Sequence, residues 1–399
     1  MSGQHACRTD ETPLRLLIVL FGVLEFDGRA QRMIEVLAQM GRVTLVDLAP
    51  ADDVSRLVIP GIDRIAVRAS TDGGRMRRHL TVLAAVLRHA IRVKPQIVVA
   101  ENFLTTGTAR LAAALTGARL VYDAYELIIP ESTGRMSGRD RFWYVLERWA
   151  VKHAAVVVAA NEDRARLMAG HYNLKRVPLV MRNIPPDRGT EFSMQAIVDE
   201  YPALARRSRE DRIILYQGDV SLSRGLARFL DAMRCLPSNY RLVVVGDGPD
   251  LQCVVELARH LAGEGRFSAV GRVPNRVMSS ITRTADVGLV TYPFEGLNNI
   301  YCASNKVFEY AQAGVPVVAT DQPSLLGIVE HYGIGVCVGQ HETPEQVARA
   351  IQSVVTRGRE AYASALARLL AENTWADEAV RFGTEMNGLL AASSRIDPT

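Results

Sequence analysis

Cysteine is scarce in this sequence, and its placement excludes two kinds of site. The five cysteines are Cys7, Cys235, Cys253, Cys302 and Cys337. No two of them form a Cys-x-x-Cys pair, so neither a zinc site nor a disulfide framework is indicated. We therefore expect reduced thiols in a cytoplasmic protein.

Long apolar runs and one glycine motif are also absent. The N-terminal stretch "MSGQHACRTDETPLRLLIVLFG" starts with polar residues, and an apolar run of only about eight residues is too short for a transmembrane helix. No small-residue cleavage site follows it, so we expect a disordered leader and then a first buried strand. The absence of Gly-x-Gly-x-x-Gly counts against a dinucleotide-binding fingerprint.

The composition and length of the chain are typical of a globular protein with two hydrophobic cores. Hydrophobic residues make up 48% of the 399 residues and charged residues 23%. A chain of this length and composition normally divides into two domains. The net charge of +4 weakly favours an anionic partner, without choosing among a nucleotide, a lipid and a nucleic acid.

Short apolar runs alternate twice over with helical patterns. The runs are continuous, as parallel strands covered on both faces require. We therefore predict an α/β protein with two doubly wound Rossmann-like domains that face each other across a cleft. The predicted strands are Leu14–Leu20, Val43–Asp47, Gln96–Ala100, Arg119–Asp123, Ala155–Ala159, Ile213–Tyr216, Arg241–Val245, Phe267–Val270, Val287–Val290, Val315–Ala319 and Gly335–Val338.

The predicted domain boundary lies in a segment without apolar periodicity. Residues 184–210 are rich in proline and charge, so we expect the interdomain linker there. We predict an N-terminal domain over residues 1–190 and a C-terminal domain over residues 191–375. Residues 376–399 are expected to form an amphipathic helix that packs back toward the N-terminal domain.

Three glycine-containing loops follow predicted strands, where ligands bind in such sheets. The first turns into a helix near Gly28, which either approaches a ligand with its backbone or simply connects strand and helix. In "ILYQGDVSLSRGLARFLDAM" a helix is expected to start at about Arg224, which suits either a phosphate group or a solvated surface. In "LVVVGDGPDL" we favour a structural role, with Asp247 or Asp250 capping the next helix.

A carboxylate, Glu309, lies inside the apolar stretch "KVFEYAQAGVPVV". A helix that begins near Ser304 would present the N–H groups of Ser304, Asn305 and Lys306 to an anion. Glu309 then lies slightly more than one turn further on, where its carboxylate can accept hydrogen bonds from both hydroxyls of a ribose. The spacing favours a nucleoside diphosphate site over the alternative, an ordinary surface glutamate.

These motifs resemble those of the retaining glycosyltransferases of family 4, which adopt the two-domain GT-B fold. The resemblance rests on "SNKVFEYAQAGVPVVAT", "VVVGDGP", "QGDVSLSRGL", "VGRVP" and "TADVGLVTYPFEG", and it is most specific over residues 213–340. "LVYDAYELIIPES" and "VMRNIP" in the N-terminal half resemble one branch of that family. The resemblance implies sugar transfer from a nucleotide diphosphate sugar, UDP-linked, with retained anomeric configuration and without a metal or other cofactor.

The resemblance also implies roles for individual residues. Glu309 matches the ribose-binding acid, Arg224 the basic residue that neutralises the diphosphate, and Gly271-Arg272 the segment that contacts the base. The turn at Ser304, Asn305 and Lys306 matches the one that holds the phosphates and the sugar. The residues expected to bind the donor are Glu309, Gly271, Arg272, Ser304, Asn305, Gly218, Asp219, Gly28, Tyr301 and Asn299.

Three positions depart from the family pattern. A second glutamate, eight residues before the ribose acid, is replaced by Tyr301. The usual Gly-Arg before the phosphate loop reads Gly218-Asp219, which removes one expected cation. The histidine of the N-terminal motif is replaced by Tyr125. The first two departures bear on the donor sugar, and the third bears on the mechanism.

The expected chemistry is departure of a nucleotide diphosphate from an anomeric carbon. Cations and helix-start N–H groups should stabilise the charge on the phosphate oxygens, and Arg224 and Lys306 are the candidates. Without an evident carboxylate nucleophile, front-face attack is compatible with the sequence. Asp123, Tyr125 and Glu126 either contact the acceptor and the donor sugar or simply cap their loop.

The expected partners are a nucleotide sugar and an acceptor that is a glycan, a glycolipid or a small molecule, and no nucleic acid. The N-terminal domain is expected on the acceptor side and the C-terminal domain on the nucleotide-sugar side. Because fold alone does not determine function, two alternatives stay open. They are a nucleotide-sugar 2-epimerase-like enzyme and a nucleotide-sugar-binding protein without catalysis.

A basic segment in the N-terminal half indicates a further partner. Residues 73–100 contain Arg75, Arg77, Arg78, Arg88, Arg92 and Lys94 and no acid. We expect an apolar face built from Leu80, Leu83, Ala84, Leu87 and Ile91 to pack on the N-terminal sheet. The cations then suit either solvent or the surface of an anionic bilayer, which would place the protein peripherally on the inner face of the membrane.

Overall fold

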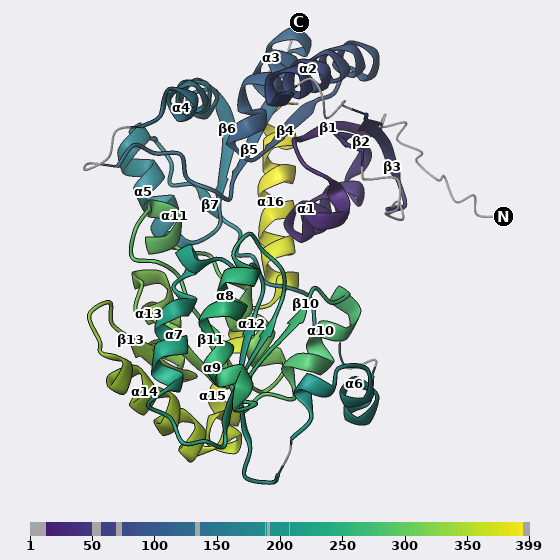
Figure 1. The fold of residues 1–399 in the computed structure, drawn as a ribbon. Helices are drawn as coiled ribbons and strands as arrows, with labels where there is room; N and C mark the ends of the chain where they lie inside the picture. The colour runs from purple at the N-terminus through teal and green to yellow at the C-terminus, as the bar shows by residue number, and fades with distance from the viewer. Residues whose placement is uncertain are drawn as a thin grey trace, which may run out of the picture. The chain divides into compact units, whose positions relative to one another are not determined.

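A computed structural model describes residues 13–49, 57–68, 74–131, 136–187, 189, 192–206 and 208–393 (Figure 1). The expected disordered leader lies outside the described residues. The chain divides into two compact units, of which unit 1 comprises Met1–Met181 with Glu378–Thr399 and unit 2 comprises Arg182–Asp377. The units therefore divide after residues 181 and 377, whereas the sequence prediction placed these boundaries after residues 190 and 375.

Unit 1 is built on one parallel sheet of seven strands in the order β3-β2-β1-β4-β5-β6-β7. Its strands β1, β4, β5 and β6 are apolar and buried along most of their length, as a sheet covered on both faces requires. The strands are β1 (Leu14–Leu20), β2 (Gly41–Leu48), β3 (Ile62–Val67), β4 (Ile97–Glu101), β5 (Arg119–Ala124), β6 (Ala154–Ala159) and β7 (Leu179–Val180).

The connections of unit 1 are helical. Asp27 caps the first helix, because its side chain accepts a hydrogen bond from the Ala30 N–H. The helices are α1 (Gly28–Ala38), α2 (Gly74–Val93), α3 (Thr106–Thr116), α4 (Gly138–Val151), α5 (Glu162–Tyr172) and α16 (Trp375–Ser393), with short 3-10 turns η1 (Leu24–Phe26) and η3 (Phe103–Thr105). No helix of the described part of the chain is long and apolar enough to cross a bilayer.

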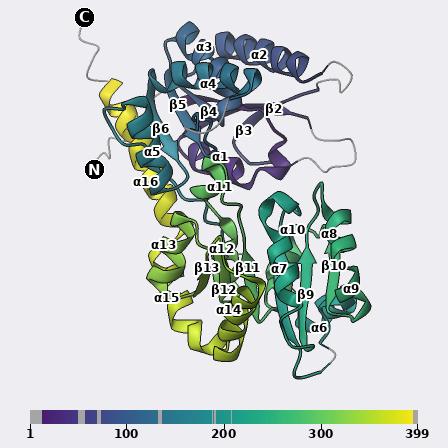
Figure 2. The ribbon, with the colours of Figure 1, turned by 60° about the vertical axis from the view of Figure 1, so that its left-hand side comes forward.

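Unit 2 repeats the architecture with six parallel strands in the order β10-β9-β8-β11-β12-β13 (Figure 2). The strands are β8 (Arg212–Gln217), β9 (Tyr240–Val245), β10 (Phe267–Gly271), β11 (Val287–Val290), β12 (Val317–Thr320) and β13 (Gly335–Val338). Two doubly wound α/β domains are therefore confirmed. Every predicted strand is present, and β3 and β7 are the two that the sequence prediction missed.

The helices of unit 2 surround this second sheet, and α7 packs against α14. They are α6 (Met194–Glu200), α7 (Leu226–Met233), α8 (Leu251–Leu257), α9 (Arg259–Gly263), α10 (Asn275–Thr282), α11 (Leu297–Ile300), α12 (Asn305–Gln312), α13 (Pro323–Tyr332), α14 (Pro344–Arg357) and α15 (Ala363–Glu372). The 3-10 turns are η4 (Pro202–Leu204), η5 (Leu222–Arg224) and η6 (Arg359–Tyr362).

The segment expected to be a linker is partly folded. It contains α6 and η4, and the side chains of Ile197 and Leu204 are buried in the core of unit 2. A helix of seven residues with a single buried side chain leaves too weak a periodicity to be recognised in the sequence. The linker prediction was therefore wrong for this part of the segment.

The prediction for the buried face of α2 was also wrong. Leu80 and Ile91 are each 58% exposed, whereas Val82, Val86 and Ala90 are buried. The helix carries two apolar stripes. Val82, Val86 and Ala90 form the stripe that packs against the rest of unit 1. Of the predicted face, Leu83 and Leu87 are half-buried, and Leu80, Ala84 and Ile91 are exposed to solvent.

The predicted C-terminal helix is present as α16, and its residues from Glu378 onward belong to unit 1. Phe382 and Met386 are fully buried. A Cβ placed on Gly383 would lie 3.9 Å from a methyl group of Val36 on α1. The helix therefore contributes to the core of unit 1, although nearly two hundred residues separate it from β7 in the sequence.

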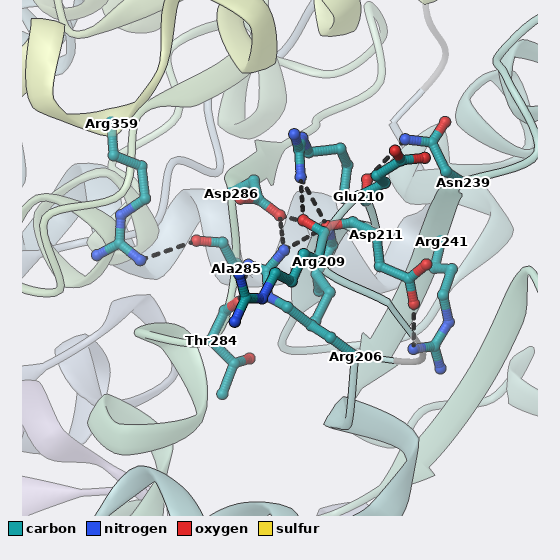
Figure 3. Close-up of polar contacts among 12 residues, drawn as sticks. Arg206, Arg209, Glu210, Asp211, Asn239, Arg241, Thr284, Ala285, Asp286 and Arg359 are labelled. Atoms are coloured by element: carbon teal, nitrogen blue, oxygen red, sulfur yellow. Dashed lines mark hydrogen bonds and ion pairs between the residues drawn. The ribbon is translucent and has the colours of Figure 1, made fainter.

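Arginines bind carbonyl and carboxylate groups at the amino-terminal edge of the unit 2 sheet (Figure 3). Arg359 donates hydrogen bonds to the carbonyl oxygens of Gly314, Arg283, Ala285 and Ala313, at 2.7 to 3.1 Å. Arg206 lies 2.9 Å from Asp286, whose carboxylate also accepts a bond from the Ile213 N–H. These contacts join the starts of β8 and β11 to the end of α12. They occupy the amino-terminal edge of the sheet, whereas ligands of such sheets bind at the carboxyl-terminal edge.

Candidate functional site

Unit 2 contains a pocket of about 640 Å³ at the carboxyl ends of β8 and β9. This is the edge at which open α/β sheets bind their ligands. The pocket is lined by Gln217, Gly218, Asp219, Val245, Gly246, Asp247, Gly248, Arg272, Val273, Met278, Tyr292, Ala303, Asn305, Lys306 and Glu309.

Glu309 projects from α12 into this pocket and is held by a neighbour from β8. The Gln217 amide donates a hydrogen bond of 2.6 Å to Glu309 Oε2. The Thr282 hydroxyl lies 2.9 Å from Gln217 Oε1, and both Gln217 and Thr282 are buried. This relay fixes one carboxylate oxygen of a side chain that lines the pocket. No sequence pattern indicates this relay, because Gln217 is the last residue of an ordinary buried strand.

The amino terminus of α12 contributes the second feature of the pocket. Ser304 is the N-cap residue, but its side chain makes no capping hydrogen bond. Ser304 Oγ and Asn305 Oδ1 are both buried, without a hydrogen-bond partner among the described residues. The first N–H groups of a helix also lack intrahelical acceptors. This turn therefore offers several polar groups and the positive end of the helix dipole to an anion.

Glycines bring three loops together around Lys306. Gly218 has a φ of +119°, and a Cβ at this position would lie 2.8 Å from Lys306 Cε. Gly246 has a φ of +143°, and its Cβ would lie 1.8 Å from the Gly218 carbonyl oxygen. Side chains at these two positions would displace the lysine and separate the loops. The Gly-Asp-Gly loop, for which we favoured a structural role, therefore also lines the pocket.

The capping role expected for Asp247 or Asp250 was wrong, because the Asp247 carboxylate accepts a hydrogen bond from the Gly248 N–H at 2.8 Å, before α8 begins. Asp250 is the N-cap residue of α8 but makes no side-chain capping bond. Its carboxylate instead accepts hydrogen bonds from the Leu222 N–H at 2.8 Å and from the Ser221 hydroxyl at 3.1 Å. Asp250 therefore holds the loop that carries Arg224.

Arg224 lies close to the pocket but in a different local structure from the expected one. It is the last residue of η5, and α7 starts two residues later, after Gly225. The guanidinium lies 5.3 Å from the ring centre of Tyr292, and the Lys306 ammonium lies 5.8 Å from the same ring. Asp219 Oδ2 is 3.6 Å from Arg224 Nε. Both expected cations thus lie close to the ring of Tyr292, which the sequence analysis missed.

Five of the residues predicted to bind the donor do not line this pocket: Gly28, which begins α1 in unit 1, and Gly271, Asn299, Tyr301 and Ser304 in unit 2. Gly271 ends β10 with a φ of +80°, and only its neighbour Arg272 reaches the pocket. Asn299 donates a hydrogen bond to the Glu295 carbonyl oxygen at 2.8 Å, within the α11 turn. Tyr301 is the C-cap residue of that short helix.

In unit 1, the carboxyl ends of β4 and β5 carry a buried charged cluster. Asp123 is fully buried, and both of its oxygens accept hydrogen bonds of 2.7 Å from Arg29 on α1. Arg29 also donates to the Met181 carbonyl oxygen. Asp123, expected to contact a substrate, is thus occupied by Arg29 beneath the surface. Glu101, the strand partner of Asp123, is buried as well, and burial followed by the Asp123 charge raises its pKa well above the usual range.

Tyr125 and Glu126 lie nearer the surface of the same edge. The Tyr125 hydroxyl is 3.3 Å from Asp27 Oδ2, and Glu126 Oε2 accepts a hydrogen bond of 2.8 Å from the Asn102 amide. Burial, and then the Asp27 charge, raise the pKa of Tyr125, so the phenol is protonated at neutral pH. Tyr125 can therefore donate a hydrogen bond, but it cannot serve as the cation that a histidine would provide.

Two residues that the sequence analysis did not select position this edge. Asn102 has a φ of 68° and a ψ of 162°, a conformation that residues other than glycine seldom adopt, and its side chain accepts from the Phe103 N–H. Asp27 caps α1 immediately before the predicted Gly28. The sequence could have indicated Asp27, because an aspartate just before a helix is a common N-cap, but it held no comparable sign of the role of Asn102. Among the described residues, no group of three or more acidic, histidine or cysteine side chains could hold a metal ion.

Two family models match the chain, one in each half. Residues 28–183 match the glycosyl transferase 4-like domain, and residues 199–368 match the glycosyl transferases group 1 domain. No curated protein matches the sequence.

Solved structures with the same fold are glycosyltransferases of low sequence identity. Sucrose-phosphate synthase from Thermosynechococcus elongatus has a TM-score of 0.76 at 17% identity, covering 95% of this chain and 100% of that one. HepE from Anabaena, in complex with UDP and glucose, has a TM-score of 0.71 at 13% identity, covering 94% and 100%. WaaG, a glycosyltransferase involved in lipopolysaccharide biosynthesis, has a TM-score of 0.71 at 18% identity, covering 92% and 98%. With a glycosyltransferase domain in each half and this two-sheet architecture, the chain is a glycosyltransferase with the GT-B fold.

Proposed function

We propose that the protein transfers a sugar from a UDP-linked donor to an acceptor, with retained anomeric configuration and without a metal ion. The observation that carries this proposal is the position of Glu309 in one pocket with Gln217, Lys306 and the start of α12. A carboxylate that is already fixed at one oxygen suits a ribose diol. A helix terminus beside a lysine suits a diphosphate. HepE, which has the same fold, binds UDP and glucose.

The leaving group receives its stabilisation from Lys306, Arg224 and the α12 amides. As the bond between the anomeric carbon and the phosphate oxygen breaks, negative charge grows on the diphosphate. Fixed cations and N–H groups lower the energy of that state. Asp219 pairs with Arg224, and a diphosphate would compete with it for the guanidinium. The acceptor oxygen attacks the anomeric carbon from the face on which the diphosphate leaves, and the acceptor's proton passes to the departing phosphate oxygen.

In this proposal the polar edge of unit 1 binds the acceptor. Tyr125 and Glu126 are the groups that can reach a ligand, since Asp123 is occupied by Arg29. Tyr125 would donate a hydrogen bond from its protonated hydroxyl. Glu126, held by Asn102, would accept one from a sugar hydroxyl.

Incubation with a panel of nucleotide sugars and candidate acceptors tests this proposal. We expect release of the nucleotide together with a glycosylated product. NMR should show that this product has the same anomeric configuration as the donor. Conversion of the donor to a 2-epimer would instead support the epimerase-like alternative. Donor binding without any turnover over the whole panel would support a non-catalytic binding protein.

We also propose that unit 1 associates peripherally with an anionic membrane, at its cytoplasmic side, through the exposed stripe of α2. Arg77, Leu80, Ala84, Arg88 and Ile91 follow each other at helical spacing, and all five are exposed. The helix contains no acidic residue. Apolar side chains flanked by arginines on one helical stripe are typical of helices that lie in a membrane interface. WaaG, of similar fold, takes part in lipopolysaccharide biosynthesis.

A further inference from the structure

Unit 1 contains a second, larger hollow of about 1120 Å³ that the proposed transfer reaction does not use. It lies between the carboxyl-terminal halves of α4 and α5, the first residues of β6 and the loop from Asn173 to Pro178. We call it the basic hollow and define it by Tyr144, Arg148, Lys152, His171, Lys175 and Arg176.

The basic hollow lies at the amino-terminal edge of the unit 1 sheet. The lining residues of β6 run from Ala154 to Val157. Asp123, Tyr125 and Glu126 lie at or beyond the carboxyl end of the neighbouring strand β5. In a parallel sheet these two ends are on opposite sides of the domain. The hollow is therefore separate from the polar edge of unit 1 described above.

The charges around the basic hollow are almost all positive. Four arginine and lysine side chains line it, against a single acid, Glu385, which lies 3.8 Å from Arg176. Arg148, Lys152 and Lys175 make no hydrogen bond or ion pair through their side chains with the described residues. The Tyr144 hydroxyl and His171 Nε2 are 2.9 Å apart and add two neutral polar groups. An anion would be attracted from solvent and would meet several free donors.

The floor of the basic hollow is apolar. Val151, Val156 and Val157 line it and are buried, and Leu179 contributes from β7. At the rim, Val177 is 62% exposed. Such a surface favours a ligand with an apolar group next to its charge over a fully hydrated ion.

We propose that the basic hollow binds the phosphate group of a small amphiphile, with the cations around the phosphate and the attached apolar chain on the valine floor. A soluble alkyl phosphate ester and the headgroup region of a phospholipid both have this chemistry. The proposal does not depend on the transfer reaction, since no residue of the hollow belongs to the pocket of unit 2.

Hexyl phosphate is the probe for this proposal, used with the full chain and saturating UDP, so that the pocket of unit 2 is occupied. The ring resonances of His171, assigned with the variant His171→Gln, report binding at the hollow. Hexyl phosphate should shift them at concentrations about tenfold lower than inorganic phosphate, since it adds burial of apolar surface. Hexanol alone should leave them unchanged.

The double variant Arg148→Gln/Lys175→Gln should weaken hexyl phosphate binding on the order of tenfold or more, because two charged donors are removed. The matched control is Arg42→Gln/Arg68→Gln, which removes two exposed charges from unit 1 outside the hollow. It should bind as the wild type does. Equal melting temperatures of both variants would show that neither unfolds the domain.

Vesicles that contain phosphatidic acid distinguish the two sources of the ligand. Sedimentation with vesicles that is weakened by Arg148→Gln/Lys175→Gln supports a lipid headgroup. Hexyl phosphate binding without such a change supports a soluble ester. The proposal is overturned if His171 does not respond to hexyl phosphate, or if the double variant binds it as tightly as the control.

Discussion

Gln217 donates a hydrogen bond of 2.6 Å to Glu309 Oε2 and lies 2.9 Å from the Thr282 hydroxyl through its own carbonyl oxygen. A buried side chain at the end of β8 thus orients the carboxylate that α12 presents to the pocket. Gln217 is a positioning residue in this arrangement, since its two functional atoms are used within the protein.

The first prediction concerns this relay. Gln217→Ala should weaken UDP binding by about 1 kcal/mol, because Glu309 loses the partner that holds it in one orientation. Thr282→Val keeps the shape of the side chain and removes only the outer hydrogen bond, so its effect should be smaller. Calorimetric titration with UDP measures both. Equal UDP affinity in wild type and Gln217→Ala would show that Glu309 needs no positioning.

The second prediction concerns Glu309 itself. Glu309→Gln keeps the size of the side chain and should weaken UDP binding by roughly 1–3 kcal/mol, because a charged acceptor for the ribose hydroxyls is lost. Binding of 2′,3′-dideoxy-UDP should change much less, since that ligand lacks the diol. A loss of equal size for both ligands would mean that Glu309 does not contact the ribose.

The third prediction separates binding from turnover. Arg224→Ala should lower kcat more than it weakens donor binding, because charge on the diphosphate is greatest in the transition state. Arg234→Ala is the matched control, since this exposed arginine follows α7 and, among the described residues, forms an ion pair with Asp231 of that helix alone. Steady-state kinetics with the donor varied measures both. Unchanged kcat in Arg224→Ala would show that this guanidinium does not stabilise the transition state.

The sequence predicted the parts of the site that come from consecutive residues and missed those that come from pairing across elements. Glu309, Lys306 and Asn305 lie within little more than one turn of the same helix, so their spacing alone brought them to one pocket. Gln217 lies ninety-two residues from Glu309 and meets it only because β8 and α12 are adjacent in the fold. Contacts of that separation leave no trace in a single sequence.

The two faces of α2 show the same limit for packing. Periodicity identified the helix, but it could not tell which of two apolar stripes is covered. That choice depends on the neighbouring layer, against which Val82, Val86 and Ala90 are buried while Leu80 is exposed. The missed strand β3 is only partly buried, so its apolar signal is weak, and β7 is two residues long.

The fourth prediction concerns metal ions. Treatment with EDTA should leave the transfer rate unchanged, because Lys306, Arg224 and the α12 amides supply the positive charge that a bound cation would otherwise provide. The rate of nucleotide release before and after chelation measures this. Loss of activity that manganese or magnesium restores would contradict the prediction, and Asp219 and Asp247, which line the pocket, would then be the first residues to test as ligands.

The fifth prediction concerns the exposed stripe of α2. The protein should float with vesicles rich in anionic lipid at low salt and be released at high salt, since each basic residue near such a surface contributes about 1 kcal/mol. Leu80→Ser/Ile91→Ser should reduce flotation without destabilising the fold, because both side chains are already 58% exposed. Val58→Ser/Val380→Ser, which changes two apolar residues outside α2 that are even more exposed, should float as the wild type does. If both double variants lost flotation to the same extent, α2 would not be the membrane contact. If the wild type did not float even at low salt, a soluble acceptor would be favoured.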